Sequence, residues 1–144
     1  MKVSEIVTGR AITVRELDHV QDVAKIMRDN DVGFVPVVDG TGRLTGVVTD
    51  RDFTTRILAR GLGYSRMFVR EVMTTGPFVT CGLEDDITLA ASRMSAGKTS
   101  RIVVTDGHEH PLAVISIADL AAREDAAAAA RVLRAVAKRE APAH

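Results

Sequence analysis

The stretch "VVDGTGRLTGVVTDRDF" at residues 37–53 returns as "VTDGHEHPLAVISIADL" at residues 104–120. The similarity extends without a gap from residues 12–59 to residues 79–126, with a shift of 67 positions and eleven identical positions. Met27/Met94 and Asp52/Asp119 are among the identical pairs. A unit that repeats over almost the whole chain indicates that the function belongs to the pair. The repeat predicts a body with pseudo-two-fold symmetry and two related clefts.

Each copy has the pattern of a strand, a helix, two strands and a second helix. We therefore expect an α/β (α+β) fold built from two β-α-β-β-α repeats. In the first copy we expect strands at residues 12–14, 34–38 and 44–48, and helices at about residues 17–27 and 50–60. In the second copy we expect strands at residues 78–80, 101–105 and 112–115, a helix at residues 84–96, and a final helix from about residue 117 to about residue 139.

Short segments outside this alignment define the expected domain limits. The lead-in "VSEIVT" at residues 3–8 resembles "VREVMT" at residues 69–74, so the lead-in is repeated too. We expect the first repeat at residues 1–60, a linker at 61–68, the second repeat at 69–126, and a C-terminal helix and tail at 127–144. This helix has Val132, Leu133 and Val136 on one side. It is expected either to pack on its own domain or to contact a second subunit.

Composition excludes several classes of function. The 144 residues carry 19 basic and 19 acidic side chains, so bulk charge does not favour a nucleic-acid partner. No apolar run reaches membrane-spanning length, and we expect a cytoplasmic protein without a membrane segment. No nucleophile, acid–base pair or metal-ligand spacing is evident, so we expect neither an enzyme nor a metal site.

Both copies place a hydroxyl and, three residues later, an acid at the end of an apolar strand. These pairs are Thr49 with Asp52 and Ser116 with Asp119. One interpretation is a capping box at a helix start, which needs no ligand. The other is a binding site, because a carboxylate can accept hydrogen bonds from the two hydroxyls of a ribose. The sequence leaves both interpretations open.

The chain resembles a tandem pair of cystathionine β-synthase (CBS) domains, also called a Bateman module, over roughly residues 1–126. The resemblance rests on the lead-in "EVMT", the stretch "FVPVVDGTGRLTGVVT" and the pattern Gly/Ala-x-x-Thr/Ser-x-x-Asp. That pattern begins at Gly46 and again at Ala113. The resemblance implies clefts between the two repeats that bind AMP, ADP, ATP, NAD(H) or S-adenosylmethionine. It also implies that Asp52 and Asp119 bind ribose, with Thr49 and Ser116 beside them.

Further binding residues are expected around these pairs. Arg51 and Arg101 occupy places where relatives often carry a basic phosphate ligand; a surface ion pair and a solvated strand end are the alternatives. Apolar walls for adenine would come from Val14, Val35, Pro36, Met73 and Ile102, for each of which ordinary core packing is the alternative.

These features predict a regulatory module that senses an adenosine-containing nucleotide, a ligand rather than a catalytic cofactor. The alternative is a ligand-free dimerisation scaffold in which the Thr/Ser-x-x-Asp pairs act only as helix caps. A pair without an output domain would act on an unidentified target protein or by dimerising. The resemblance implies a homodimer that packs through the second helix of each copy, whose surplus apolar residues are Phe53, Ile57, Leu58, Leu120 and Ala121.

Overall fold

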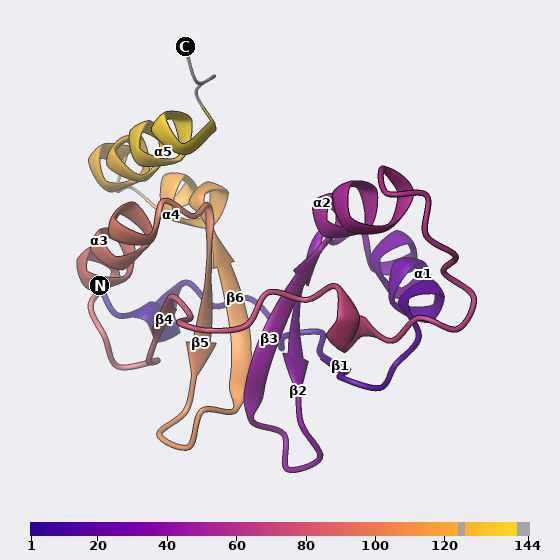
Figure 1. Ribbon diagram of the computed structural model, residues 1–144. Helices are drawn as coiled ribbons and strands as arrows, with labels where there is room; N and C mark the ends of the chain where they lie inside the picture. Colours follow the sequence, from indigo (N-terminus) through magenta and orange to yellow (C-terminus); the bar gives the residue numbers. More distant parts are fainter. Residues whose placement is uncertain (124–125, 141–144) are drawn as a thin grey trace. The chain divides into compact units, whose positions relative to one another are not determined.

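The computed structural model describes residues 1–123 and 126–140, and the chain divides into two compact units (Figure 1). The first-repeat unit consists of Ala11–Phe78 and Glu109–Pro111. The second-repeat unit consists of Met1–Arg10, Val79–His108 and the chain from Leu112 onward. Each unit therefore contains one copy of the repeat together with a short piece from another part of the chain.

Each unit is built on a three-stranded mixed sheet. In the first-repeat unit, β1 (Val14–Arg15) pairs in parallel with β2 (Phe34–Val38), and β2 pairs antiparallel with β3 (Leu44–Thr49). In the second-repeat unit, β4 (Thr80–Cys81), β5 (Arg101–Thr105) and β6 (Pro111–Ser116) follow the same order, with β4 parallel to β5. The predicted α/β fold with two copies of one unit is confirmed.

The first helix of each repeat buries an apolar stripe. Helix α1 (Val20–Asn30) buries Val20, Val23 and Met27, which recur at three- and four-residue steps. Helix α3 (Ile87–Gly97) buries the side chains at the corresponding positions. Both helices end at a residue in the left-handed conformation, with φ 52° at Asp31 and φ 50° at Lys98.

The second helices of the two repeats differ. Helix α2 (Asp50–Phe53) continues as a π-helical turn over Thr54–Leu58, in which the amide of Ala59 donates to the carbonyl oxygen of Thr54 at 2.8 Å. Helix α4 (Ile117–Ala122) instead ends after six residues, with Arg123 as its C-terminal cap. The first repeat therefore keeps its chain helical beyond the position at which the second repeat stops.

The prediction of one helix from about residue 117 to about residue 139 is wrong. The chain breaks after α4 and forms a separate helix, α5 (Ala126–Glu140), which packs against α3 and α4 (Figure 1). The break lets α5 bury Ala128, Ala129, Val132 and Val136, which join the core of the second-repeat unit. Leu133 does not share this face and is 59% exposed. Helix α5 thus packs on its own domain, and tail residues 141–144 lie outside the described residues.

The repeated lead-ins are exchanged between the repeats. The amide of Val3 donates to the carbonyl oxygen of Asp85 at 2.9 Å, and the amide of Val69 donates to that of Asp18 at 2.9 Å. The lead-in that precedes each copy therefore packs on the other copy. The two hydrogen bonds have the same length and join equivalent residues of the two copies. The internal repeat therefore extends to the backbone hydrogen bonds of the lead-ins.

Two apolar clusters, one in each unit, form the cores. Cys81 is 2% exposed in the second-repeat unit, and burial raises the pKa of its thiol to about 11. The thiol is therefore protonated at neutral pH and packs as a small apolar group. In the described part of the chain, every helix is too short or too polar to cross a membrane.

Candidate functional site

The hydroxyl–acid pairs lie where a strand passes into a helix. Thr49 ends β3, and its Oγ1 accepts a hydrogen bond from the amide of Asp52 at 3.2 Å, while Asp52 Oδ2 accepts one from the amide of Thr49 at 2.8 Å. At the start of α4, Ser116 Oγ accepts from the amide of Asp119 at 3.2 Å, and Asp119 Oδ2 accepts from the amide of Ser116 at 2.7 Å. Both pairs form the reciprocal capping boxes that one interpretation predicted, and the binding of a ligand at these pairs stays a prediction.

Capping leaves both carboxylates able to accept further hydrogen bonds. An ionised carboxylate offers about four lone-pair sites. The capping box uses one site on Asp52, whose side chain is 14% exposed. Asp119 Oδ2 accepts from the amide and hydroxyl of Ser116, whereas its Oδ1 accepts no hydrogen bond from residues 1–123 or 126–140. A ligand with two adjacent hydroxyls therefore has acceptors at both junctions.

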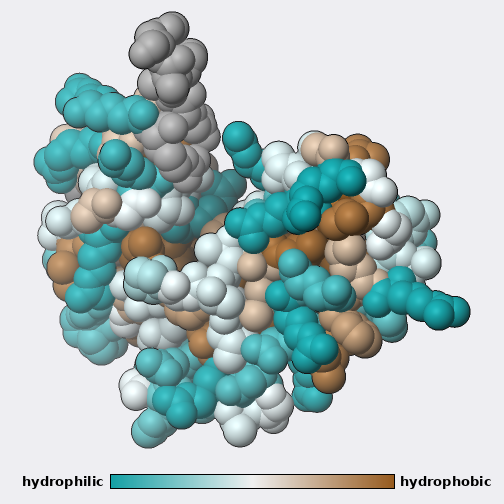
Figure 2. All heavy atoms as spheres, in the orientation of Figure 1, coloured by the Kyte–Doolittle hydropathy of each residue, from teal (hydrophilic) through white to brown (hydrophobic). Residues whose placement is uncertain are grey.

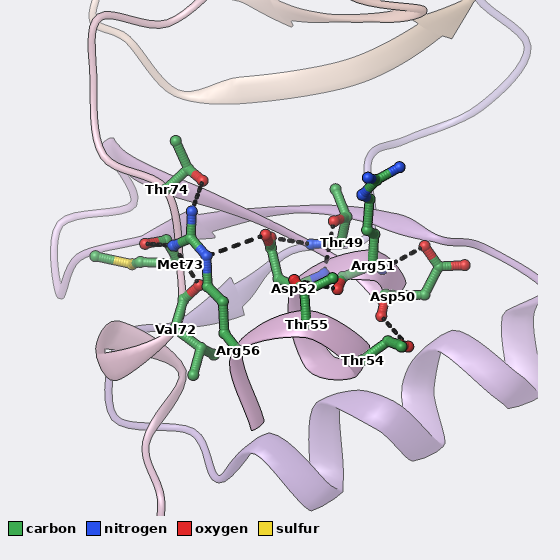
Figure 3. A network of polar contacts seen from close by, with 10 residues as sticks. All are labelled: Thr49, Asp50, Arg51, Asp52, Thr54, Thr55, Arg56, Val72, Met73 and Thr74. Atoms are coloured by element: carbon green, nitrogen blue, oxygen red, sulfur yellow. Dashed lines mark hydrogen bonds and ion pairs between the residues drawn. The ribbon is translucent and has the colours of Figure 1, made fainter. Parts of the chain in front are cut away.

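Arg56 is a site residue that the sequence interpretation missed (Figure 3). Its Nη1 donates to the carbonyl oxygens of Val72 at 3.0 Å and Met73 at 3.3 Å. Its Nη2 donates to Thr74 Oγ1 at 3.4 Å, and its Nε lies 3.6 Å from Asp52 Oδ1. The available signals were its position four residues after Asp52 and its identity with Arg123 in the repeat.

Arg101 lies at the same junction as Ser116. The carbonyl oxygen of Ser100 accepts from Arg101 Nη1 at 3.0 Å and from the amide of Ile117, the first residue of α4, also at 3.0 Å. The structure thus brings Arg101 to the start of α4, although Ile117, the first residue of that helix, lies 16 residues further along the chain. A phosphate contact by Arg101 remains a prediction.

Arg51 is exposed, and Figure 3 shows its side chain pointing away from the Arg56 contacts. Its amide donates to Asp50 Oδ1 at 2.8 Å, while no ion pair joins its guanidinium to an acid among the described residues. The surface ion pair considered as an alternative is therefore absent from the described part of the structure. A phosphate contact by Arg51 also remains a prediction.

Three of the expected adenine-wall residues have side chains in the cores. Val14 is 2% exposed, and Val35 and Ile102 are 0% exposed. Pro36 is buried as well, whereas Met73 is half-buried at the edge of the first-repeat core. Of this set, Met73 has the side chain most accessible to a ligand.

Met73 covers Gly46, the glycine of the repeated pattern. A Cβ atom added at Gly46 would lie 2.5 Å from Met73 Sδ, which is far closer than van der Waals contact. The second repeat has Ala113 in place of Gly46, and the lead-in that packs on it has Val7 in place of Met73. In the second repeat the strand residue is larger (Ala113 for Gly46) and the lead-in residue is smaller (Val7 for Met73). The two strand–helix junctions therefore differ in shape.

A separate apolar pocket of about 340 Å³ lies on the helical face of the first-repeat unit. Figure 2 shows apolar surface among hydrophilic side chains over the region where Figure 1 places α1 and α2. The exposed fractions are 76% for Leu58, 41% for Leu62 and 53% for Tyr64. The pocket is lined by Val20, Gln21, Ala24, Phe53, Ile57, Leu58, Leu62 and Tyr64.

Comparison with known families identifies the two units. The model of the CBS domain family matches residues 3–59 and again residues 69–125. The chain belongs to the CBS domain family and contains a tandem pair of these domains. The resemblance inferred from the repeated Thr/Ser-x-x-Asp pattern is therefore confirmed.

The relatives include large enzymes and small proteins. The chain is 27% identical to homoserine O-acetyltransferase of Methanocorpusculum labreanum over 86% of its own length, but spans only 24% of that enzyme. It is 29% identical to the CBS domain-containing protein YhcV of Bacillus subtilis, and the match covers 85% of this chain and 84% of that protein. The similarity to the enzyme thus lies within the CBS part.

Two solved structures share the fold and contain adenosine compounds. A CBS domain protein from Pyrobaculum aerophilum, complexed with AMP, has a TM-score of 0.76 at 21% identity, covering 93% of this chain and 99% of that one. The CBS domain pair of protein MJ0100, in complex with 5′-methylthioadenosine and S-adenosyl-L-methionine, has a TM-score of 0.75 at 23% identity, covering 85% and 94%.

Proposed function

We propose that the protein is a non-catalytic regulatory module that binds an adenosine-containing ligand through Asp52, Asp119 or both. The observation that carries this proposal is the repeated capping box, which fixes each carboxylate while leaving it acceptor sites for a ribose diol. The adenosine compounds bound to other CBS proteins support the choice of ligand class. The competing proposal is a scaffold in which the caps serve folding alone.

Adenosine should bind more tightly than 2′,3′-dideoxyadenosine, which lacks the diol. Losing hydrogen bonds to a carboxylate should weaken binding by about 1.5–3 kcal/mol. Isothermal titration calorimetry with the two nucleosides measures this difference, and AMP, ATP, NAD and S-adenosylmethionine then define the preferred substituent. Ligand at about 100 times its Kd should stabilise the native state by about 2.7 kcal/mol and raise the Tm. Absence of both heat and Tm shift with all five adenosine compounds would favour the scaffold.

We also propose that the chain forms a homodimer through the pocket face of the first-repeat unit. Exposed Leu58, Leu62 and Tyr64 provide apolar area that an isologous contact would cover on both subunits. Leu120 was expected to contribute to the dimer contact, but it cannot do so because it is 0% exposed within the second-repeat core. This narrows the proposed contact to the helical face around α1 and α2.

Leu58→Asp should convert the dimer into a monomer while the protein remains folded. Leu58 is 76% exposed, so the aspartate would be solvated in the monomer but desolvated in the dimer. Light scattering at micromolar concentration measures the mass, and circular dichroism checks the fold. Leu133→Asp is the matched control, because Leu133 is 59% exposed on α5. A wild-type mass of one chain, or an unchanged dimer in Leu58→Asp, would contradict the proposed contact.

A further inference from the structure

Arg56 joins the candidate ribose carboxylate to the lead-in of the other repeat. One guanidinium uses Nε toward Asp52 and its two terminal nitrogens toward Val72, Met73 and Thr74 (Figure 3). The planar fork of arginine makes these contacts simultaneously, which a single ammonium group cannot do. Arg56 therefore contacts Asp52 and the lead-in at the same time, and neither contact has to break for the other to form.

The lead-in is tied to the sheet at the point that Arg56 contacts. The amide of Thr74 donates to the carbonyl oxygen of Val47 at 2.8 Å, and the amide of Val47 donates to that of Thr74 at 2.9 Å. Four residues later, after Phe78, the chain leaves the first-repeat unit. A ligand that makes Thr74 more or less mobile would therefore change the mobility of the segment that leads from one unit to the other.

Among the residues that the structure describes, the second repeat has no equivalent of this connection. Arg123 occupies the position of Arg56, but it lies at the C-terminal cap of α4. Its side chain makes no hydrogen bond or ion pair with residues 1–123 or 126–140. The π-helical turn over Thr54–Leu58, where Arg56 is located, is one local difference between the two copies, and such turns are often found at functional sites.

We propose that Arg56 is a positioning residue that couples occupancy of the Asp52 site to the order of the lead-in Val72–Thr74. This inference rests on the proposed function, because it requires a ligand at Asp52. A ligand that holds the carboxylate restricts the guanidinium, and a restricted guanidinium holds the lead-in carbonyls more firmly. The coupling is reciprocal, so an ordered lead-in also favours ligand binding. Because Arg123 makes no such contacts with the described residues, we expect no equivalent coupling through it.

Residue-resolved hydrogen exchange of the full chain tests the proposal, with adenosine as the ligand. In the ligand-free protein, Arg56→Gln should accelerate exchange of the Thr74 and Val47 amides by roughly tenfold, because charge-assisted bonds to the lead-in are lost. Saturating adenosine should slow these amides in the wild type but not in Arg56→Gln. Arg56→Lys should resemble Arg56→Gln at Thr74 although its charge is retained. Arg123→Gln is the matched control and should behave as the wild type does.

The outcomes separate the two proposals. Calorimetric binding of adenosine together with unchanged Thr74 exchange in Arg56→Gln would overturn the coupling and leave the ligand proposal intact. Adenosine protection of Thr74 that persists in Arg56→Gln would overturn the coupling as well. If the wild type binds none of the five adenosine compounds, both proposals fail, and faster exchange in ligand-free Arg56→Gln then shows that Arg56 has a structural role alone.

Discussion

Asp52→Ala and Asp119→Ala should each weaken adenosine binding at their own site by about 1.5–3 kcal/mol, which is roughly a ten- to hundredfold rise in Kd. The reason is that each substitution removes the carboxylate oxygens available to a ribose diol. In the wild type, the capping bonds of Asp52 leave its Oδ1 facing Arg56. The capping bonds of Asp119 go to its Oδ2, and its Oδ1 accepts no hydrogen bond from the described residues. Calorimetry on the two single variants and the double variant shows which junction binds the ligand.

Because both acids also cap helices, stability must be measured beside affinity. Each alanine variant should lower the free energy of unfolding by about 0.5–2 kcal/mol through loss of the cap. Asp52→Asn separates the two roles, since its amide oxygen can still accept from the Thr49 amide while the charge is lost. Thr49→Ala is the opposite control, which removes the capping hydroxyl and keeps the carboxylate. Unchanged adenosine affinity in both Asp→Ala variants would disprove the ribose assignment.

The sequence was sufficient to predict the parts of the fold that depend on local patterns. The strands Phe34–Val38 and Arg101–Thr105 lie where runs rich in β-branched residues predicted them. The capping boxes were also predictable, because they involve residues three positions apart. The repeat also supported the predicted order of the elements, because the same pattern occurs twice in the chain.

The exchanged lead-ins and the Arg56 contacts could not be predicted in this way. Val3 packs on the second repeat and Val69 on the first, although each lies next to the other repeat in sequence. Arg56 reaches carbonyl oxygens 16 and 17 residues further along the chain. The Arg56 side chain extends from a π-helical turn, and no residue pattern in the sequence predicted that turn. Such contacts are set by tertiary packing, about which helical periodicity carries no information.

The two leucines of the C-terminal region show the same limit and give the second large expected effect. The sequence pattern grouped Leu133 with Val132 and Val136 on one side of its helix, which was expected either to pack on its own domain or to contact a second subunit, and it assigned Leu120 to a surface for dimerisation. The structure buries Leu120, which is 0% exposed where α5 packs against α4, and it leaves Leu133 59% exposed while Val132 and Val136 are buried. The stability of the second-repeat unit should therefore depend strongly on Leu120 and weakly on Leu133.

Leu120→Ala should lower the free energy of unfolding by about 2–5 kcal/mol, because it leaves a cavity in a core that cannot close fully around it. Leu133→Ala should change it by no more than about 0.5 kcal/mol, as expected for a surface position. Urea denaturation with unchanged m-values measures both, and wild type and variants are compared at equal protein concentration because the stability of a dimer depends on that concentration. Similar losses in the two variants would mean that α5 does not cover α4 in solution. Leu120 would then be free to contribute to a subunit contact, as the sequence alone had suggested.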